Sequence, residues 1–163
     1  MYADSLEFLD EERDAWRPFE ALESLTDEQL ERHVEAAHGW SGRDLIGHLV
    51  AWQEHAVAVA RELAVGETSP TKIKGDADWD TGGDAINERL IGEWAALSMD
   101  EVRRRFHSTP GELRGYLTVV PERRWLKDPD NLHFFQDETV DHYEGHRAEL
   151  EAILDAARRG TDG

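Results

Sequence analysis

Two histidines four residues apart, His142 and His146, are the residues of this chain best suited to chemistry. They lie in the segment "ETVDHYEGHRAEL", whose pattern predicts a helix, and four residues is a little over one helical turn. The two imidazoles therefore share one helical face. The apolar residues that continue this face are Leu150, Ile153, Leu154 and Ala157. Both histidines thus occupy positions where core leucines are expected.

The spacing of this pair is weak evidence by itself, because 8 histidines in 163 residues give about 0.4 such pairs by chance. The alternative interpretation is a pair of buried histidines that only form hydrogen bonds. A third imidazole favours a metal site. His48 in "SGRDLIGHLVAWQEH" is in phase with Leu45 and Trp52 on the inner face of another predicted helix. Three neutral imidazoles on one ion leave coordination positions open, which is typical of reactive sites.

Acidic residues near these histidines offer further chemistry. Asp44 lies one helical turn before His48, and Glu138 one turn before His142, so either can accept the remaining ring N–H. Both acids also suit the first turn of a helix, where the helix dipole favours negative charge. The candidates for a general base, which the sequence does not rank, are Asp44, Glu54, Glu138 and Glu144.

The remaining histidines are weaker candidates. His55 follows His48 by two turns and either borders the same cavity or packs on an amphipathic face. His133 precedes the last helix and can line a pocket mouth. The histidines expected on the surface are His33, His38 and His107. No zinc-protease, nucleophile-elbow, phosphate-loop or dinucleotide motif is present, and neither histidine-bearing helix has the Glu-x-x-His spacing of a di-iron bundle.

The elements that must position these residues are helical throughout, with no convincing strand pattern. The predicted helices span about 5–24, 41–65, 84–97, 98–118 and 136–160. Pro18 is expected to interrupt the first helix, and Pro110 the fourth. Two long irregular connections, 66–83 and 121–135, are expected to wall a pocket. The pattern predicts an all-α four-helix bundle with long connections, forming a single domain over residues 1–163.

Two helix starts carry capping residues. Ser41 followed by Asp44, and Ser98 followed by Glu101, both match the capping-box spacing. Gly66 is expected to end the helix that Ser41 begins.

The composition restricts the partners of the protein. The net charge is −18, from 36 acidic and 18 basic residues, which argues against nucleic acid as a partner. The chain has no cysteine, so disulfides and thiolate metal sites are excluded. No apolar run approaches the length of a membrane span, and the acidic N-terminus is unlike a signal peptide. We expect a soluble cytoplasmic protein without nucleic-acid or membrane partners.

The segments "HGWSGRDLIGHLVAWQEH" and "DHYEGHRAEL" resemble the DinB/YfiT-like superfamily, which includes thiol S-transferases and the metal-binding domain of mycothiol-dependent maleylpyruvate isomerase. The family places a histidine at the end of W-(S/T)-x-x-(D/E)-x-x-x-H and an H-x-x-x-H pair on the last helix. Trp40–His48 and the His142–His146 pair match these motifs. The resemblance implies a four-helix bundle with long crossover connections, frequent homodimers, and a divalent metal on His48, His142 and His146. Member metals are zinc, nickel, iron and manganese, so the metal's identity stays open.

The leading hypothesis is therefore a metal-dependent enzyme that hydrolyses a small electrophile or transfers a low-molecular-weight thiol onto it. The metal would lower the pKa of a bound water or thiol. One alternative is a non-catalytic bundle that binds a small ligand or partner, because "WDTGGDAINERLIGEWAALSMDEVRRRF" also resembles bundle proteins of unknown function, some without metal ligands. A third is a structural protein whose metal only holds helices together.

Overall fold

A computed structural model describes residues 1–161 of the chain, and these residues are helical with no β-strand among them. The α-helices are α1 (Ser5–Trp16), α2 (Asp27–Glu31), α3 (Gly42–Val65), α4 (Pro70–Ala95), α5 (Met99–Val119), α6 (Pro129–Glu138), α7 (Val140–Gly145) and α8 (Arg147–Thr161). Short 3₁₀ helices lie at Arg17–Ser24, Glu35–Ala37 and Glu122–Arg124. No helix in the described part of the chain is long and apolar enough to cross a membrane. The all-α class predicted from the sequence is confirmed.

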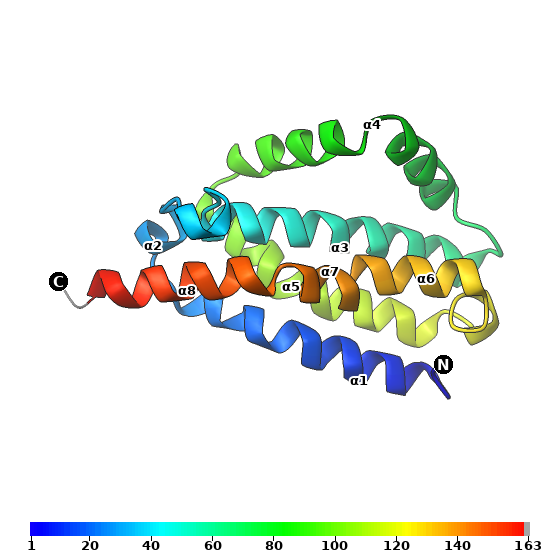
Figure 1. Cartoon of the computed structure of the whole chain (residues 1–163). Coiled ribbons are helices and arrows are strands. Elements are labelled where there is room, and N and C mark those ends of the chain that lie inside the picture. The colour runs from blue at the N-terminus through cyan, green and yellow to red at the C-terminus, as the bar shows by residue number, and fades with distance from the viewer. Residues whose placement is uncertain (162–163) are drawn as a thin grey trace.

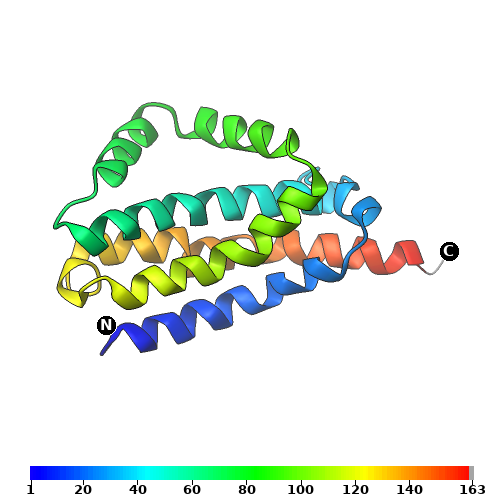
Figure 2. The ribbon, with the colours of Figure 1, turned by 180° about the vertical axis from the view of Figure 1, so that it is seen from behind.

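The long helices α1, α3 and α5 run alongside the row formed by α6, α7 and α8, whereas α4 arches away from them over α3 (Figures 1 and 2). The core is apolar and consists of two clusters. One surrounds Trp16, Leu49 and Tyr143, and the other surrounds Phe8, Leu63 and Trp125. Burial of these side chains between α1, α3, α5 and the α6–α8 row is the main force that holds the fold together.

Helix α3 begins and ends where its capping residues predict. The Ser41 side chain accepts a hydrogen bond from the Asp44 N–H, while the Asp44 carboxylate accepts one from the Ser41 N–H. Gly66 is the C-terminal cap. Ser98 caps α5 through the Glu101 N–H, although the Glu101 carboxylate turns to Arg104 rather than closing the box.

The two prolines behave differently. Helix α1 ends at Trp16, and Pro18 lies in the 3₁₀ helix that follows, so the predicted interruption is confirmed. The predicted break near Pro110 is wrong, because α5 continues through it. Pro110 is buried, so its ring packs with the apolar face of α5 rather than ending the helix.

Helix α4 corrects the expected irregular connection over 66–83. The chain is helical from Pro70, with Ser69 as its N-terminal cap, and one non-helical residue, Gly82, divides α4 into two pieces. The sequence pattern did not indicate the first piece because Trp94 is the one buried residue of α4, so no apolar stripe marks it. Helix α4 is a polar strap over the bundle.

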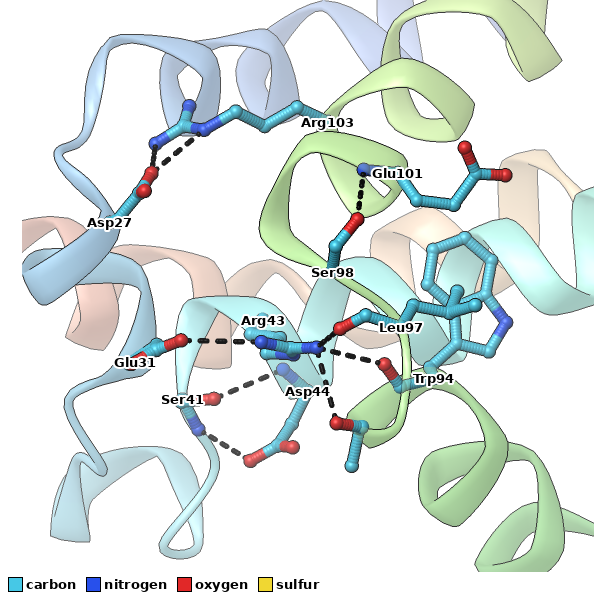
Figure 3. A network of polar contacts seen from close by, with 11 residues as sticks. Asp27, Glu31, Ser41, Arg43, Asp44, Trp94, Leu97, Ser98, Glu101 and Arg103 are labelled. Atoms are coloured by element: carbon cyan, nitrogen blue, oxygen red, sulfur yellow. Dashed lines mark hydrogen bonds and ion pairs between the residues drawn. The ribbon is translucent and has the colours of Figure 1, made fainter.

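Both ends of α4 are tied to α3. The Arg43 guanidinium donates to the backbone carbonyls of Trp94, Ala95 and Leu97 at the C-terminal end of α4 (Figure 3). At the other end, the Glu62 carboxylate accepts a hydrogen bond of 3.0 Å from the Thr71 N–H. The strap is therefore anchored by polar contacts at its ends.

The last predicted helix is three helices with two breaks. Thr139 (φ −126°, ψ −97°) separates α6 from α7, and His146 (φ −110°, ψ 12°) separates α7 from α8. The row also begins earlier than predicted. Part of the connection expected at 121–135 is helical, because Asp128 caps α6 and Pro129 occupies its first position, where proline is favoured.

Candidate metal centre

Three imidazoles from two distant segments meet in the interior. His48 comes from α3, His142 from α7, and His146 from the break between α7 and α8. The Nε2 atoms of His48 and His142 lie 2.9 Å apart. The ring centroid of His146 is 4.8 Å from that of His48 and 5.0 Å from that of His142. The structure therefore brings the three sequence-predicted residues together.

The donor set fits a single divalent ion. One ring nitrogen from each histidine can be chosen so that all three lie within 4.8 Å of one another. Two imidazoles on one tetrahedral ion are about 3.3 Å apart, given metal–nitrogen bonds of about 2.0–2.1 Å. The Nδ1 atoms of all three rings are buried and lack a hydrogen-bond partner among residues 1–161. The Nε2 atoms of His48 and His142 face each other, so these are the nitrogens that would bind the ion, and the Nδ1 atoms of these two rings would carry the N–H.

The histidines are held in the neutral form that metal ligation requires. Burial, together with His146, lowers the pKa of His48 to about 4. Burial and the two neighbouring imidazoles lower the pKa of His142 to about 3. The pKa of His146 is also lowered by burial, which the nearby Glu149 carboxylate opposes. At neutral pH each ring can offer a lone pair.

Two neighbours of the centre were given no role there from the sequence, although Trp40 begins the family motif that ends at His48. The Trp40 indole stacks on His146, with centroids 5.6 Å apart and 18° between the planes, and meets the edge of His48. The largely buried Glu149 places a carboxylate oxygen 3.6 Å from Nδ1 of His146. Its position three residues after His146, on the same helical face, is the signal that could have identified it.

A buried polar network holds α7 in place behind the centre. The hydroxyl of Tyr143, which follows His142, donates to Glu12 over 3.0 Å and accepts from Gln53 over 2.9 Å. Glu12 is 1% exposed and forms an ion pair with Arg114. Because the network joins α1, α3, α5 and α7, it fixes the helix that carries His142.

The centre opens onto a cavity of about 590 Å³ between α3, α4 and α6. We call it the α4 cavity. His48 and His142 line its inner end. The other lining residues are Trp52, His55, Lys72, Gly75, Asp76, Trp79, Asp80, Asn87, Asp130, His133, Phe134, Asp137 and Glu138. The volume is that of a small-molecule site.

The wall of this cavity contains one of the four acids considered as a base. Glu138 lines it, and burial together with Asp137 and Asp76 raises the pKa of Glu138 to about 8. Asp44 is occupied in capping α3. Glu54 faces Arg105 on another side of α3.

The remaining acid, Glu144, is exposed. Among residues 1–161 no histidine ring forms a hydrogen bond with Asp44 or Glu138, and the nearest ring nitrogen to Asp44 is Nδ1 of the exposed His33, at 3.7 Å. Helix capping by Asp44 is therefore the interpretation that the structure supports.

Of the other five histidines, two border the α4 cavity and three are exposed on the surface, as expected from the sequence. His55 borders the α4 cavity and contacts Phe134, with ring centroids 5.6 Å apart. His133 lies at the cavity mouth, with Asp137 as its partner. The exposed side chains are those of His33, His38 and His107.

Comparison with known families adds an independent result. The family described as "Mycothiol maleylpyruvate isomerase N-terminal domain" matches residues 9–133. The chain belongs to this family, which is part of the DinB-like superfamily. The match includes His48 and ends before His142 and His146. No curated protein and no solved structure gave a significant match.

Proposed function

We propose that this protein is a metal-dependent enzyme that transfers a low-molecular-weight thiol onto a small electrophile. One observation carries the proposal: two of the three converging histidines, His48 and His142, line a substrate-sized cavity. A centre that only tied helices together would have no need of such an opening. The family description names a thiol, mycothiol, which supports a thiol over water as the nucleophile.

In this proposal His48, His142 and His146 hold a divalent metal ion, which supplies Lewis acidity that favours the thiolate form of the co-substrate. The identity of the metal is left open among zinc, nickel, iron and manganese. Glu149 orients His146 by facing Nδ1 of its ring. Trp40 stacks on one face of His146 and shields that face from water.

Glu138 is the group that we assign to proton transfer. Its carboxyl lines the same cavity as His48 and His142. A pKa near 8 leaves Glu138 largely protonated at pH 7 and lies close to that of a free thiol, about 8.5, so the ionised fraction of Glu138 can take the thiol proton and the protonated form can return it. For an electrophile with an activated C=C bond, the thiolate sulfur forms a C–S bond to one carbon as the π bond breaks, and Glu138 donates its proton to the carbon that receives the electron pair.

The scaffold in this proposal is a single four-helix-bundle domain over residues 1–163. The side-by-side packing of α1, α3, α5 and the α6–α8 row supports it (Figure 1). Helix α4 then serves as the long crossover connection between α3 and α5.

The test combines elemental analysis with a thiol-transfer assay on protein without a polyhistidine tag. His146→Ala should weaken metal binding by about 100-fold or more and abolish thiol consumption, while keeping the helical circular-dichroism spectrum. The matched control is His107→Ala, which removes an exposed imidazole outside the centre. If the native protein retains no divalent ion, or if His146→Ala retains it as tightly, the proposal fails. Electrophile consumption without thiol would indicate hydrolysis instead.

A further inference from the structure

The lining of the α4 cavity carries a strong excess of negative charge. Five of its fifteen lining residues are acids, against a single lysine, and one of the five, Glu138, is largely neutral at pH 7 because burial and nearby carboxylates raise its pKa to about 8. Asp76 pairs with Lys72 over 2.8 Å, and Asp137 pairs with His133 over 3.1 Å. No ion pair or hydrogen bond satisfies the other three carboxyl groups among residues 1–161, namely those of Asp80, Asp130 and Glu138.

Aromatic rings form the other part of the wall. Trp52 and Trp79 meet edge to face with centroids 5.6 Å apart, and the Trp52 N–H donates to Asn87 over 3.0 Å. Phe134 contacts His55 on the α6 side. Aromatic faces attract cations through the ring quadrupole, and carboxylates at the same site add Coulomb attraction.

The ammonium group of Lys72 already lies between an aromatic ring and a carboxylate of this wall. The Lys72 side chain, which is 18% exposed, has its Nζ 5.8 Å from the centroid of Phe134 and beside the Asp76 carboxylate. The raised pKa of Glu138 has the same electrostatic origin, since Asp137 and Asp76 add to the effect of burial. The cavity is therefore a favourable environment for added positive charge and an unfavourable one for added negative charge.

We propose that the α4 cavity selects a substrate carrying an ammonium or guanidinium group and discriminates against carboxylate substrates. This inference rests on the proposed function, because it takes the α4 cavity as the substrate site. The cation lies against the aromatic wall that Trp52 and Trp79 form, and the unpaired carboxylates of Asp80 and Asp130 attract it from the rim. The reacting end of the molecule points towards His48 and His142.

The experiment measures binding, without turnover, by isothermal titration calorimetry at low salt. The probes are benzylamine, benzyl alcohol and benzoate, which share a ring and differ in charge. Benzylamine should bind about tenfold or more tightly than benzyl alcohol, and benzoate more weakly than both. Equal binding of the three probes, no binding of any, or tightest binding of benzoate that persists in His146→Ala overturns the inference.

Two pairs of substitutions test whether the preference for benzylamine comes from the cavity. Asp80→Asn with Asp130→Asn should reduce the preference for benzylamine by about threefold or more, because two rim charges are lost. The matched control, Glu20→Gln with Glu28→Gln, removes the same number of charges at exposed positions that lie outside the cavity and have no ion pair or hydrogen bond within residues 1–161. It should leave the preference unchanged. Equal effects of the two pairs would make the preference a property of net charge and would overturn the assignment to the cavity.

A parallel titration of His146→Ala separates this inference from the proposed function. If benzoate binds the native protein but not His146→Ala, the metal holds it rather than the cavity wall. The charge preference of the cavity is then the ratio of the probe affinities measured with His146→Ala. If the charge preference persists while no metal or thiol transfer is found, the proposed function fails and the inference stands. If metal and thiol transfer are present without a charge preference, only the inference fails.

Discussion

At the scale of single residues, the centre is built from groups that are costly to bury. His48 is 6% exposed, and its closest polar neighbour is another imidazole, His142. Burial disfavours a charge on either ring, and the two rings cannot both be charged without repelling each other, so they are held in the neutral form. A bound ion would convert these desolvated lone pairs into ligands, which is why the arrangement suits a metal better than a packing role.

Acid should destabilise the metal-free protein through these histidines. Their folded pKa values of about 4 and about 3 lie below the unfolded value of 6.5. Between pH 6.5 and about 3 the unfolded chain therefore binds more protons, so this part of the stability is present above pH 6.5 and is lost as the pH falls. His142→Gln should flatten the fall of the melting temperature between pH 7 and 4. The exposed His107→Gln should not, and an equal slope in native protein and His142→Gln would contradict the prediction.

Glu138→Gln should separate proton transfer from metal binding. The variant keeps the shape of the side chain but cannot take a proton, so the rate of thiol transfer should fall about 100-fold or more while the metal content stays unchanged. Its stability should change with the opposite sign to that of the histidines. The folded pKa of about 8 lies above the ordinary value of 4.5, so the native protein loses stability as the pH rises from 4.5 to 8.

The glutamine variant is spared this loss, so its melting temperature relative to the native protein should be higher at pH 9 than at pH 5. Glu144→Gln, at an exposed position on α7, is the control. A full rate of thiol transfer in Glu138→Gln would exclude Glu138 as the acid–base group.

At the scale of the elements, α7 depends on the network behind it. Tyr143→Phe removes a hydrogen bond to the buried Glu12 carboxylate and leaves Gln53 without its partner. The expected loss of unfolding free energy is about 1–3 kcal/mol. Chemical denaturation measures it, and metal affinity should fall in the same variant because His142 is the preceding residue.

Tyr116→Phe is the matched control for this change. Its hydroxyl accepts a hydrogen bond from Arg61 at an exposed position, so the loss should be within about 0.5 kcal/mol. Equal losses in the two variants would show that the buried network has no special part in holding α7.

What the sequence predicts depends on how each element is stabilised. Helix α3 is amphipathic and capped by Ser41 at one end and Gly66 at the other, so its bounds follow from local chemistry. Helix α4 has neither an apolar stripe nor acidic residues in its first turn, and its glycines and aspartates are typical of loops.

The site shows the same contrast. The apolar stripes placed His48, His142 and His146 on inward faces and so predicted that they converge, and the family resemblance implied the same metal ligands. The break at Thr139 has no pattern that predicts it. The contact between Trp40 and His146 joins segments more than a hundred residues apart, and packing determines it rather than any local preference.

At the scale of the whole molecule, helix α4, which covers the α4 cavity, is held mainly at its ends. Arg43 joins the C-terminal end of α4 to α3 (Figure 3), and Gly47 allows Trp94 to approach closely, since a β-carbon there would lie 2.9 Å from the Trp94 Cβ. Between the anchors, α4 is largely exposed. A strap of this kind can open locally without unfolding the bundle.

Arg43→Ala should make the C-terminal end of α4 open more often. Loss of the guanidinium leaves the carbonyls of Trp94, Ala95 and Leu97 without that donor, so amide hydrogens of residues 84–95 should exchange about tenfold faster. Exchange in the middle of α3 should be unchanged. Arg89→Ala, which removes a surface ion pair within α4, is the control and should have no effect. Uniform acceleration over all helices would instead indicate global destabilisation.

The stacking of Trp40 on His146 gives the protein an optical reporter of its own centre. Any ion that draws the imidazole into coordination alters the electron density beneath the indole and therefore its fluorescence. Among the six tryptophans of the chain, Trp40 is the one that meets two of the three histidines, so Trp40→Phe should silence the emission change while the other five continue to emit. Occupancy of the centre can then be followed in solution by light alone, without a label.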